Sequence, residues 1–284
     1  MLKQRIVTAL ALLAVLIPAL LYPSPTPFLS IALLLMTAGA WEWGRLNGLT
    51  HFKSLASALA CSVICLGGWV LDGPMLQTPW LWILGGLAWT CACIGILVAG
   101  PSSWQRIPLW VRMFWGMVSL SLAWLALAQA RVIGANFLLS ILLLVWAADI
   151  FAYFVGRAMG GRIFKRRLAP SISPGKSWEG VLGGALGVIC VAFIWTWLDG
   201  LWAATTVSLY TRLFAHGSGI LLFALVYLIA MSVMGDLVES LIKRSAGVKD
   251  SSNLLPGHGG VLDRVDAMLP VLPLAMMWHS VLVP

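Results

Sequence analysis

Long apolar runs limit what this chain can fold into more than any other feature of its sequence. A helix needs about 20 mostly apolar residues to cross a hydrocarbon core of ~30 Å. Runs of at least 16 such residues recur along the chain, separated by turns and charged segments. Each run predicts a transmembrane helix. We place nine of them near residues 6–22, 28–43, 55–71, 80–99, 113–130, 137–155, 180–198, 218–234 and 267–283.

The composition supports this interpretation. Of the 284 residues, 61% are hydrophobic and only 10% are charged, whereas roughly 25% are charged in a typical soluble domain. So few charged side chains could not cover the surface of a soluble globule of this size. The same arithmetic excludes a disordered chain, a disulfide scaffold and a coiled coil. The predicted fold class is an all-α polytopic membrane protein with about nine transmembrane helices.

The basic residues predict the orientation, because cytoplasmic loops carry an excess of lysine and arginine. With nine helices and a cytoplasmic N-terminus, 16 of the 18 basic residues fall in inside segments, and only Arg131 and Arg212 fall outside. We therefore predict an outside C-terminus. This placement also explains the net charge of +8 without a nucleic-acid partner, and none is expected. We divide the chain into residues 1–136, with helices one to five, and residues 137–284, with helices six to nine and cytoplasmic loops 156–179 and 235–266.

Charge is concentrated in two windows of the C-terminal half. Residues 149–179 contain eight charged residues and residues 236–266 contain nine, which together are 17 of the 28 in the chain. Both windows fall on the cytoplasmic side of the predicted topology. In a sequence with so little charge, this concentration indicates a functional site facing the cytoplasm.

The second window contains two carboxylate pairs. Asp236 and Glu239 close one predicted span, and Asp263 and Asp266 open the next. Residues three apart share one face of a helix. Two such pairs at facing helix ends supply the oxygen ligands that Mg²⁺ prefers.

Positive charge and glycine accompany these acids. The turn at residues 257–260 reads Gly-His-Gly-Gly, and its backbone N–H groups are suited to phosphate oxygens. Carboxylates for metal and cations for phosphate predict phosphoryl or nucleotidyl transfer, in which the protein mainly positions groups and neutralises charge. The alternative, a positive-inside loop with capping aspartates, explains five acids in one loop poorly. The predicted phosphate-binding cations are Lys243, Arg244, Lys249 and Arg264.

The pattern in this window resembles a known signature. It reads Ser240-x-x-Lys243-Arg244-x4-Lys249-Asp250, then Leu255-Pro256-x-His258-Gly259-Gly260-x-x-Asp263-Arg264-x-Asp266. This is similar, at every fixed position, to the signature of the bacterial phosphatidate cytidylyltransferase (CDP-diacylglycerol synthase) family. The similarity extends from about residue 140 to the C-terminus.

The resemblance implies a membrane enzyme of phospholipid biosynthesis that converts phosphatidic acid and CTP into CDP-diacylglycerol and pyrophosphate. It implies a bacterial inner membrane location, bound Mg²⁺, and a second, monovalent cation such as K⁺ as an option. Asp236, Asp263 and Asp266 are the implied metal ligands. Asp263, Asp266, Lys249 and His258 are the candidate catalytic residues, although a turn-fixing hydrogen bond explains His258 equally well.

The first window adds further candidates. Asp149 lies about seven residues, or ~10 Å, inside its predicted helix, where an ionisable group suggests function; the alternative is a carboxylate paired with a neighbouring helix. The segment Ser173-Pro174-Gly175-Lys176-Ser177-x-Glu179-Gly180 resembles the family's Ser-Pro-Lys-Lys-Thr-x-Glu-Gly, with glycine where the family commonly has its first lysine. The predicted substrate-binding residues are Lys243, Arg244, Arg264, Lys176, Ser173, Gly259, Gly260 and Asp149.

Other functions stay open at this stage. A CTP-dependent polyprenol or phytol kinase would release CDP and could use Asp149 as its base. A transporter of an anionic solute would place charge at mid-bilayer and show repeated halves. CTP, phosphatidic acid and membrane lipids are the expected partners, and a homodimer is possible. Of the remaining acids, Glu42 is interpreted as structural and Asp199 as solvated in an outside loop.

Overall fold

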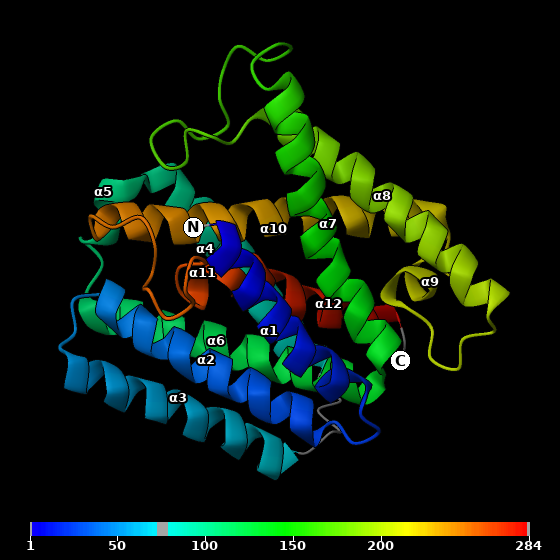
Figure 1. Ribbon diagram of the computed structural model, residues 1–284, viewed down its shortest axis with the longest axis horizontal. Coiled ribbons are helices and arrows are strands. Elements are labelled where there is room, and N and C mark those ends of the chain that lie inside the picture. Colours follow the sequence, from blue (N-terminus) through cyan, green and yellow to red (C-terminus); the bar gives the residue numbers. More distant parts are fainter. Residues whose placement is uncertain (1, 73–78, 283–284) are drawn as a thin grey trace.

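The protein is a bundle of helices (Figure 1). The computed structural model describes residues 2–72 and 79–282, and within these ranges there is no β-strand. The long helices are α1 (Leu2–Leu21), α2 (Thr26–Leu46), α3 (His51–Asp72), α4 (Pro79–Ala99), α6 (Leu109–Ile133), α7 (Ala135–Met159), α8 (Trp178–Leu201), α10 (Ser218–Ser245) and α12 (Met268–Leu282). The short ones are α5 (Pro101–Trp104), α9 (Leu209–Phe214) and α11 (Leu262–Val265).

The predicted all-α membrane fold is confirmed. Each of the nine apolar runs falls on one of the long helices, apart from Tyr22 and Ala267, which lie just beyond helix ends, and residue 283, which lies outside the described residues. In the described part of the chain, seven helices are long and apolar enough to cross a membrane: α3, α4, α6, α7, α8, α10 and the α11–α12 segment. The apolar part of α1 is shorter, and α2 is not among the seven. The count of nine spans, the orientation and the division after residue 136 stay predictions.

Glycines let α8 pack closely against α7. A Cβ atom added at Gly180 would lie 2.9 Å from the Ala152 carbonyl oxygen, and one at Gly184 would lie 2.8 Å from that of Ala148. Small residues at such positions allow two helix backbones to approach each other within a membrane. The pair is joined by residues 160–177, which we call the basic loop and which form the upper end of the molecule in Figure 1.

A second close approach, between α10 and the start of α12, shapes the site described below. At Gly235 on α10, an added Cβ would lie 2.9 Å from the Asp266 carbonyl oxygen and 2.8 Å from Pro270. Glycine is therefore required where α10 passes the α11–α12 junction. As a result, the acids that follow Gly235 lie beside those that open the last helix.

The interpretation of Asp199 as solvated is wrong. This side chain at the end of α8 is only 6% exposed. Its carboxylate accepts hydrogen bonds from Asn136 Nδ2 at 2.8 Å, the Ser208 backbone N–H at 2.8 Å and Thr211 Oγ1 at 2.6 Å. The chain after α8 turns back against the start of α7, so an apparent loop acid becomes the buried anchor of the α8–α9 connection.

Asp199→Asn is therefore expected to destabilise the protein, because one acceptor oxygen becomes an amide that faces donors. Leaving a buried donor without its partner costs about 1–3 kcal/mol. Thermal unfolding of the purified protein in detergent should show a lower midpoint than wild type. Asp250→Asn, at an exposed aspartate, is the matched control and should unfold like wild type. An unchanged midpoint for Asp199→Asn would contradict the anchoring role.

Candidate active site

The two charged windows, far apart in sequence, meet in the structure. Lys176 in the basic loop pairs with Asp236 on α10, with 2.5 Å between Nζ and Oδ2. Arg244, at the end of α10, donates from Nε to the Ile172 carbonyl oxygen at 3.3 Å and from a terminal nitrogen to the Val248 carbonyl oxygen at 3.2 Å. These contacts join the basic loop to the end of α10 and to residues 246–261, which we call the signature loop.

A cavity of about 610 Å³ opens where α7, α8, α10 and the basic loop meet. Asp149, Arg157, Lys176 and Asp236 line its polar part, while small and apolar residues of the three helices line the rest. Asp149 is exposed to this cavity and lies within electrostatic range of Asp236, Lys176 and Arg264. The cavity thus offers both a charged wall and an apolar wall.

Glu179 anchors the basic loop to the first turn of α8. Its Oε1 atom accepts backbone hydrogen bonds from Gly161 at 2.9 Å, Ile163 at 3.0 Å and Phe164 at 2.9 Å. Ser177 caps the same helix by accepting from the Gly180 N–H at 3.1 Å, as serine often does at a helix start. These bonds fix the loop that presents Lys176 and Ser173. Glu179 was not among the predicted site residues, although it stands in the quoted Ser173–Gly180 segment.

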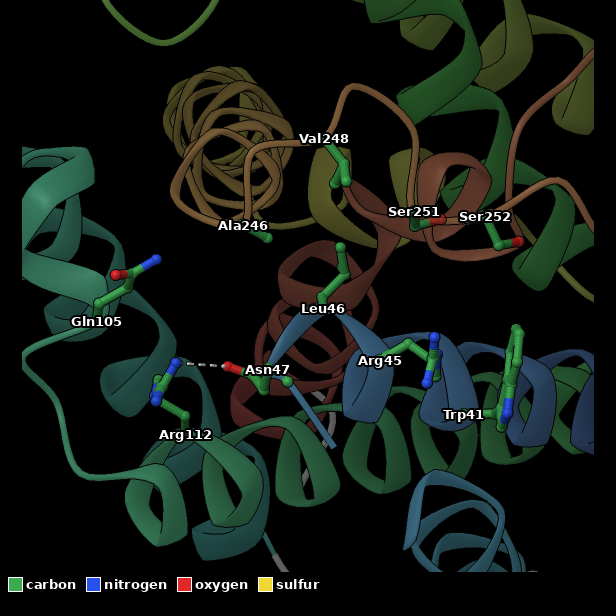
Figure 2. A pocket seen from close by; sticks show the side chains of 11 residues that line it. Trp41, Arg45, Leu46, Asn47, Gln105, Arg112, Ala246, Val248, Ser251 and Ser252 are labelled. Carbon is green, nitrogen blue, oxygen red and sulfur yellow. Dashed lines mark hydrogen bonds between the residues drawn. The ribbon is translucent and has the colours of Figure 1, made fainter. Parts of the chain in front are cut away.

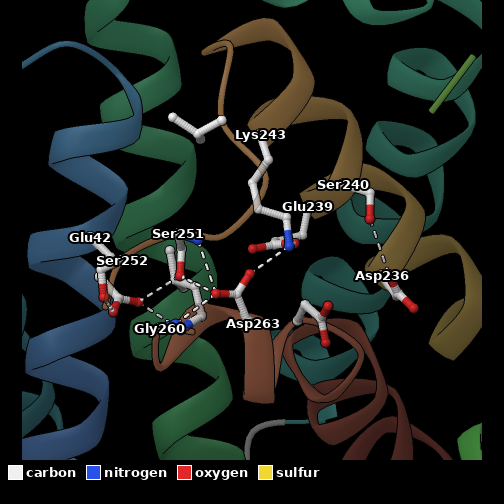
Figure 3. Close-up of polar contacts among 12 residues, drawn as sticks. Glu42, Asp236, Glu239, Ser240, Lys243, Ser251, Ser252, Gly260 and Asp263 are labelled. Atoms are coloured by element: carbon white, nitrogen blue, oxygen red, sulfur yellow. Dashed lines mark hydrogen bonds and ion pairs between the residues drawn. The ribbon is translucent and has the colours of Figure 1, made fainter. Parts of the chain in front are cut away.

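Lys243 and Asp263 form the centre of the second window (Figure 3). The Lys243 ammonium lies 2.5 Å from Asp263 Oδ1 and also pairs with Glu239, one turn back on α10. Asp263 Oδ2 accepts from Ser251 N at 2.9 Å, Ser251 Oγ at 2.9 Å and Gly260 N at 2.7 Å. The Asp263 side chain is only 4% exposed. A buried carboxylate needs such partners to remain ionised.

Glu42 of α2 holds the other side of the signature loop, as Figure 3 shows. It is fully buried. Its Oε1 accepts from Ser252 Oγ at 2.5 Å and Val261 N at 2.9 Å, and its Oε2 accepts from Ser251 Oγ at 3.2 Å and Leu262 N at 2.7 Å. The structural interpretation of Glu42 is confirmed. Its partners were not predictable, since they lie more than 200 residues away.

Glycine is needed at different positions of the signature loop for different structural reasons. Gly257 and Gly259 adopt positive φ angles of 77° and 81°, a region that L-residues with side chains rarely populate. Gly260 has no room for a side chain, because an added Cβ would collide with Ser251 Oγ and Glu42 Oε1. The Gly260 N–H is donated to Asp263, so in this arrangement it serves the loop itself. Phosphate binding by Gly259 and Gly260 stays a prediction.

The remaining predicted residues surround this centre. Asp266, at the α11–α12 junction, lies within electrostatic range of Asp236 and Asp149 and accepts from the Ala267 N–H at 2.7 Å. Lys249 and Arg264 are exposed. The Nδ1 atom of His258 is buried, with no hydrogen-bond partner among the described residues. The hydrogen bond expected to fix the turn is instead made by the His258 backbone N–H, which donates to the Leu255 carbonyl oxygen at 2.8 Å.

The side chains of the site offer the type of donor atom, carboxylate oxygen, that a hard cation prefers. Four carboxylates on α10, α11 and the α11–α12 junction supply only oxygens, and the buried Glu239 Oε1 has no hydrogen-bond partner in the described ranges. Within those ranges, no three Asp, Glu, His or Cys side chains are arranged to hold a metal ion, and lysine ammonium groups lie among the acids instead. Mg²⁺ commonly takes one or two carboxylates together with substrate phosphates and water. The donor atoms are therefore of the kind that a divalent metal takes when other oxygens complete its coordination.

Comparison with known proteins identifies the family. The model of the cytidylyltransferase family matches residues 3–282. A phosphatidate cytidylyltransferase of Pseudomonas aeruginosa is 37% identical over 99% of this chain and 98% of its own length. One from Haemophilus influenzae is 34% identical over 96% of each chain. One from Thermotoga maritima is 40% identical over 54% of this chain and 52% of its own length.

The fold and the charged centre define an integral membrane enzyme that transfers nucleotidyl groups. More particularly, the chain belongs to the cytidylyltransferase family, to which its relatives over nearly the whole chain also point. The predicted resemblance is therefore confirmed, and it extends beyond residue 140 into the N-terminal helices.

Glu42→Gln is expected to loosen the signature loop, because an amide cannot accept from four donors that converge on two carboxylate oxygens. Hydrogen exchange at the Val261 and Leu262 amides should become at least about tenfold faster, which corresponds to losing a charge-assisted hydrogen bond. Asn253→Asp, at an exposed position of the same loop, is the control and should leave that exchange unchanged. Wild-type protection in Glu42→Gln would show that the loop does not depend on this carboxylate.

Proposed function

We propose that this chain is a phosphatidate cytidylyltransferase, which forms CDP-diacylglycerol and pyrophosphate from CTP and phosphatidic acid. The observation that carries the proposal is the convergence of both charged windows through the Lys176–Asp236 pair, at a cavity with one apolar wall. A lipid phosphate requires such a combination of charged and apolar surface. The relatives that span nearly the whole chain carry the same activity in their names, which favours it over a lipid kinase or a transporter.

The chemistry is an in-line displacement at phosphorus. A phosphate oxygen of phosphatidic acid attacks the α-phosphorus of CTP and forms a new P–O bond. The bond between the α-phosphorus and the oxygen bridging to the β-phosphate breaks, and pyrophosphate leaves with that electron pair. The attacking group is already anionic, so the main obstacle is repulsion between it and the triphosphate. The protein's task is to position the two anions and to neutralise their charge.

The lysines of the site are suited to that task. Lys176, which lines the cavity, pairs with Asp236, and Lys243, two turns further along α10 than Asp236, pairs with Glu239 and Asp263. When a phosphate group enters beside Lys176, the lysine ammonium exchanges its Asp236 partner for an anionic substrate oxygen. The ammonium therefore does not have to lose water a second time. Arg264 lies near Asp149, and together with Arg244 and Lys249 it supplies further positive charge.

Mg²⁺ is proposed as the cofactor, with Asp236, Asp263 and Asp266 as its protein ligands. When bound, it would neutralise the non-bridging and leaving oxygens of the triphosphate. Glu239, whose buried Oε1 has no hydrogen-bond partner among the described residues, joins this set as a further candidate. A monovalent cation such as K⁺ stays an option beside it.

The location proposed for the enzyme is the bacterial inner membrane, with the site facing the cytoplasm. The support is the distribution of lysine and arginine, with 16 of 18 on one side of a nine-span topology. CTP is a cytosolic nucleotide, and the signature loop follows the end of α10 on that side.

The experiment that tests the function identifies the products of the reaction. Purified protein with phosphatidic acid, Mg²⁺ and CTP labelled at the α-phosphorus should move label into a lipid that contains cytidine and should release unlabelled pyrophosphate. Removing divalent metal with EDTA should abolish turnover, and added Mg²⁺ should restore it. Labelled CDP in solution, together with transfer of the γ-phosphate to a lipid alcohol, would identify a kinase instead.

Lys176→Gln should lower kcat/KM by at least about tenfold, because it removes a charged donor from the wall of the cavity. Lys165→Gln is the matched control, since Lys165 lies in the same basic loop, is exposed and does not line the cavity. Initial rates at varied CTP and phosphatidic acid will show which substrate depends on Lys176. Equal kcat/KM values for Lys176→Gln and Lys165→Gln would contradict a role of Lys176 in substrate binding.

A further inference from the structure

A second cavity, of about 680 Å³, lies against another side of the signature loop (Figure 2). Three separate parts of the chain form its walls. Arg45 and Asn47 come from the end of α2, Gln105 and Arg112 come from α5–α6, and Ser251 and Ser252 come from the signature loop. None of these residues lines the cavity that contains Asp149 and Lys176. The proposed reaction assigns no role to it.

The charge of this cavity is one-sided. Its walls include two arginines and no carboxylate. The ion pairs among the described residues involve Lys176 and Lys243, so neither Arg45 nor Arg112 has an acid of that part of the chain within 4.0 Å. Two arginines that line the same cavity without a counter-charge favour an anionic ligand.

Arg112 is held in place but keeps donors free. One terminal nitrogen donates to Asn47 Oδ1 at 3.3 Å, and this oxygen also accepts from Trp104 Nε1 at 3.1 Å. Asn47 is only 6% exposed, and its own amide donates to the Trp43 carbonyl oxygen at 2.9 Å. The Nε atom of Arg112 is buried without a hydrogen-bond partner among the described residues. A buried donor of this kind costs free energy unless something accepts from it.

We propose that this cavity is a second anion-binding site, which takes a phosphate-bearing anion along the walls that carry Arg45 and Arg112. The planar, multidonor guanidinium matches phosphate oxygens. Arg45 is exposed and donates to the Leu49 carbonyl oxygen at 3.3 Å, so its charge is available to a ligand from outside. The phosphate can belong to a free polyphosphate in solution or to the headgroup of an anionic lipid, and the experiment below separates these sources.

A ligand in this cavity would act on the site already described. Ser251 lines the cavity, and its hydroxyl lies within hydrogen-bonding distance of both Glu42 and Asp263. Ser252 lines it too and bonds to Glu42. A bound phosphate beside these serines would therefore contact the same loop that bonds to Asp263.

The test measures occupancy without turnover. Gln105 lines the cavity and is exposed, so Gln105→Cys is introduced into a variant whose five native cysteines are replaced. The rate of modification by a soluble thiol reagent is measured in two preparations. One is in phosphatidylcholine nanodiscs with added inorganic pyrophosphate, and the other is in nanodiscs that contain phosphatidic acid with no added anion. Sodium chloride at matched ionic strength is the reference.

We expect modification to slow at least about tenfold in one preparation or in both. Protection by pyrophosphate identifies a free polyphosphate as ligand, and protection by phosphatidic acid identifies a lipid headgroup. Arg45→Gln combined with Arg112→Gln should abolish the protection. Arg106→Gln should keep the protection. Arg106 follows Gln105 in sequence, is exposed and carries the same charge as Arg45 and Arg112, but it does not line the cavity.

Protection in neither preparation overturns the proposal, and so does protection that survives the double substitution. Should the double variant fail to fold, Arg45→Gln alone decides, since it changes an exposed side chain. That single variant should require about tenfold more anion for the same protection, and wild-type protection would count against the site. Because no CTP is consumed, this outcome is independent of whether the protein forms CDP-diacylglycerol.

Discussion

Two buried carboxylates, Glu42 and Asp263, hold the signature loop in place, and the rest of the site depends on them. Glu42 comes from the second helix and Asp263 from the start of the last segment, and Ser251 bonds to both. Each carboxylate accepts several hydrogen bonds, which is what keeps a charge tolerable away from water. Through this shared partner, the loop connects the two halves of the chain. The N-terminal helices therefore contribute to the site without supplying any residue of its signature.

Charge in this protein is balanced locally by lysine. Lys243 lies between Glu239 and Asp263, and Lys176 neutralises Asp236 across the gap between the basic loop and α10. Breaking a buried pair leaves an uncompensated charge, which is strongly unfavourable. In the proposed reaction, substrate phosphates and a bound metal would replace these partners together. The pairing keeps these carboxylates and lysines locally neutral until then.

The sequence predicted the elements that depend on local pattern. The apolar runs predicted the long helices, and the clustering of charge at residues 149–179 and 236–266 indicated the candidate site, where the structure brings the two windows together. It did not predict which charges pair, since the Lys176–Asp236 and Glu42–Ser251 contacts depend on how helices pack. Asp199 shows the same limit. An acid after an apolar run resembles a solvated loop residue unless the return of the chain to Asn136 and Ser208 is known.

Some residues of the signature have to hold the loop in place and are also candidates for binding metal or phosphate. Asp263 is a candidate metal ligand, yet its two oxygens already accept from Lys243, Ser251 and Gly260. Gly260 is a predicted phosphate-binding residue, yet its lack of a side chain is required by Glu42 and Ser251. Loss of activity on replacing Asp263 would therefore combine a disturbed loop with a lost ligand. Asp266 separates the two effects better, because its described hydrogen bond is only to the neighbouring Ala267 N–H. An amide at position 266 changes the charge that faces Asp236 while the bonds that hold the signature loop remain.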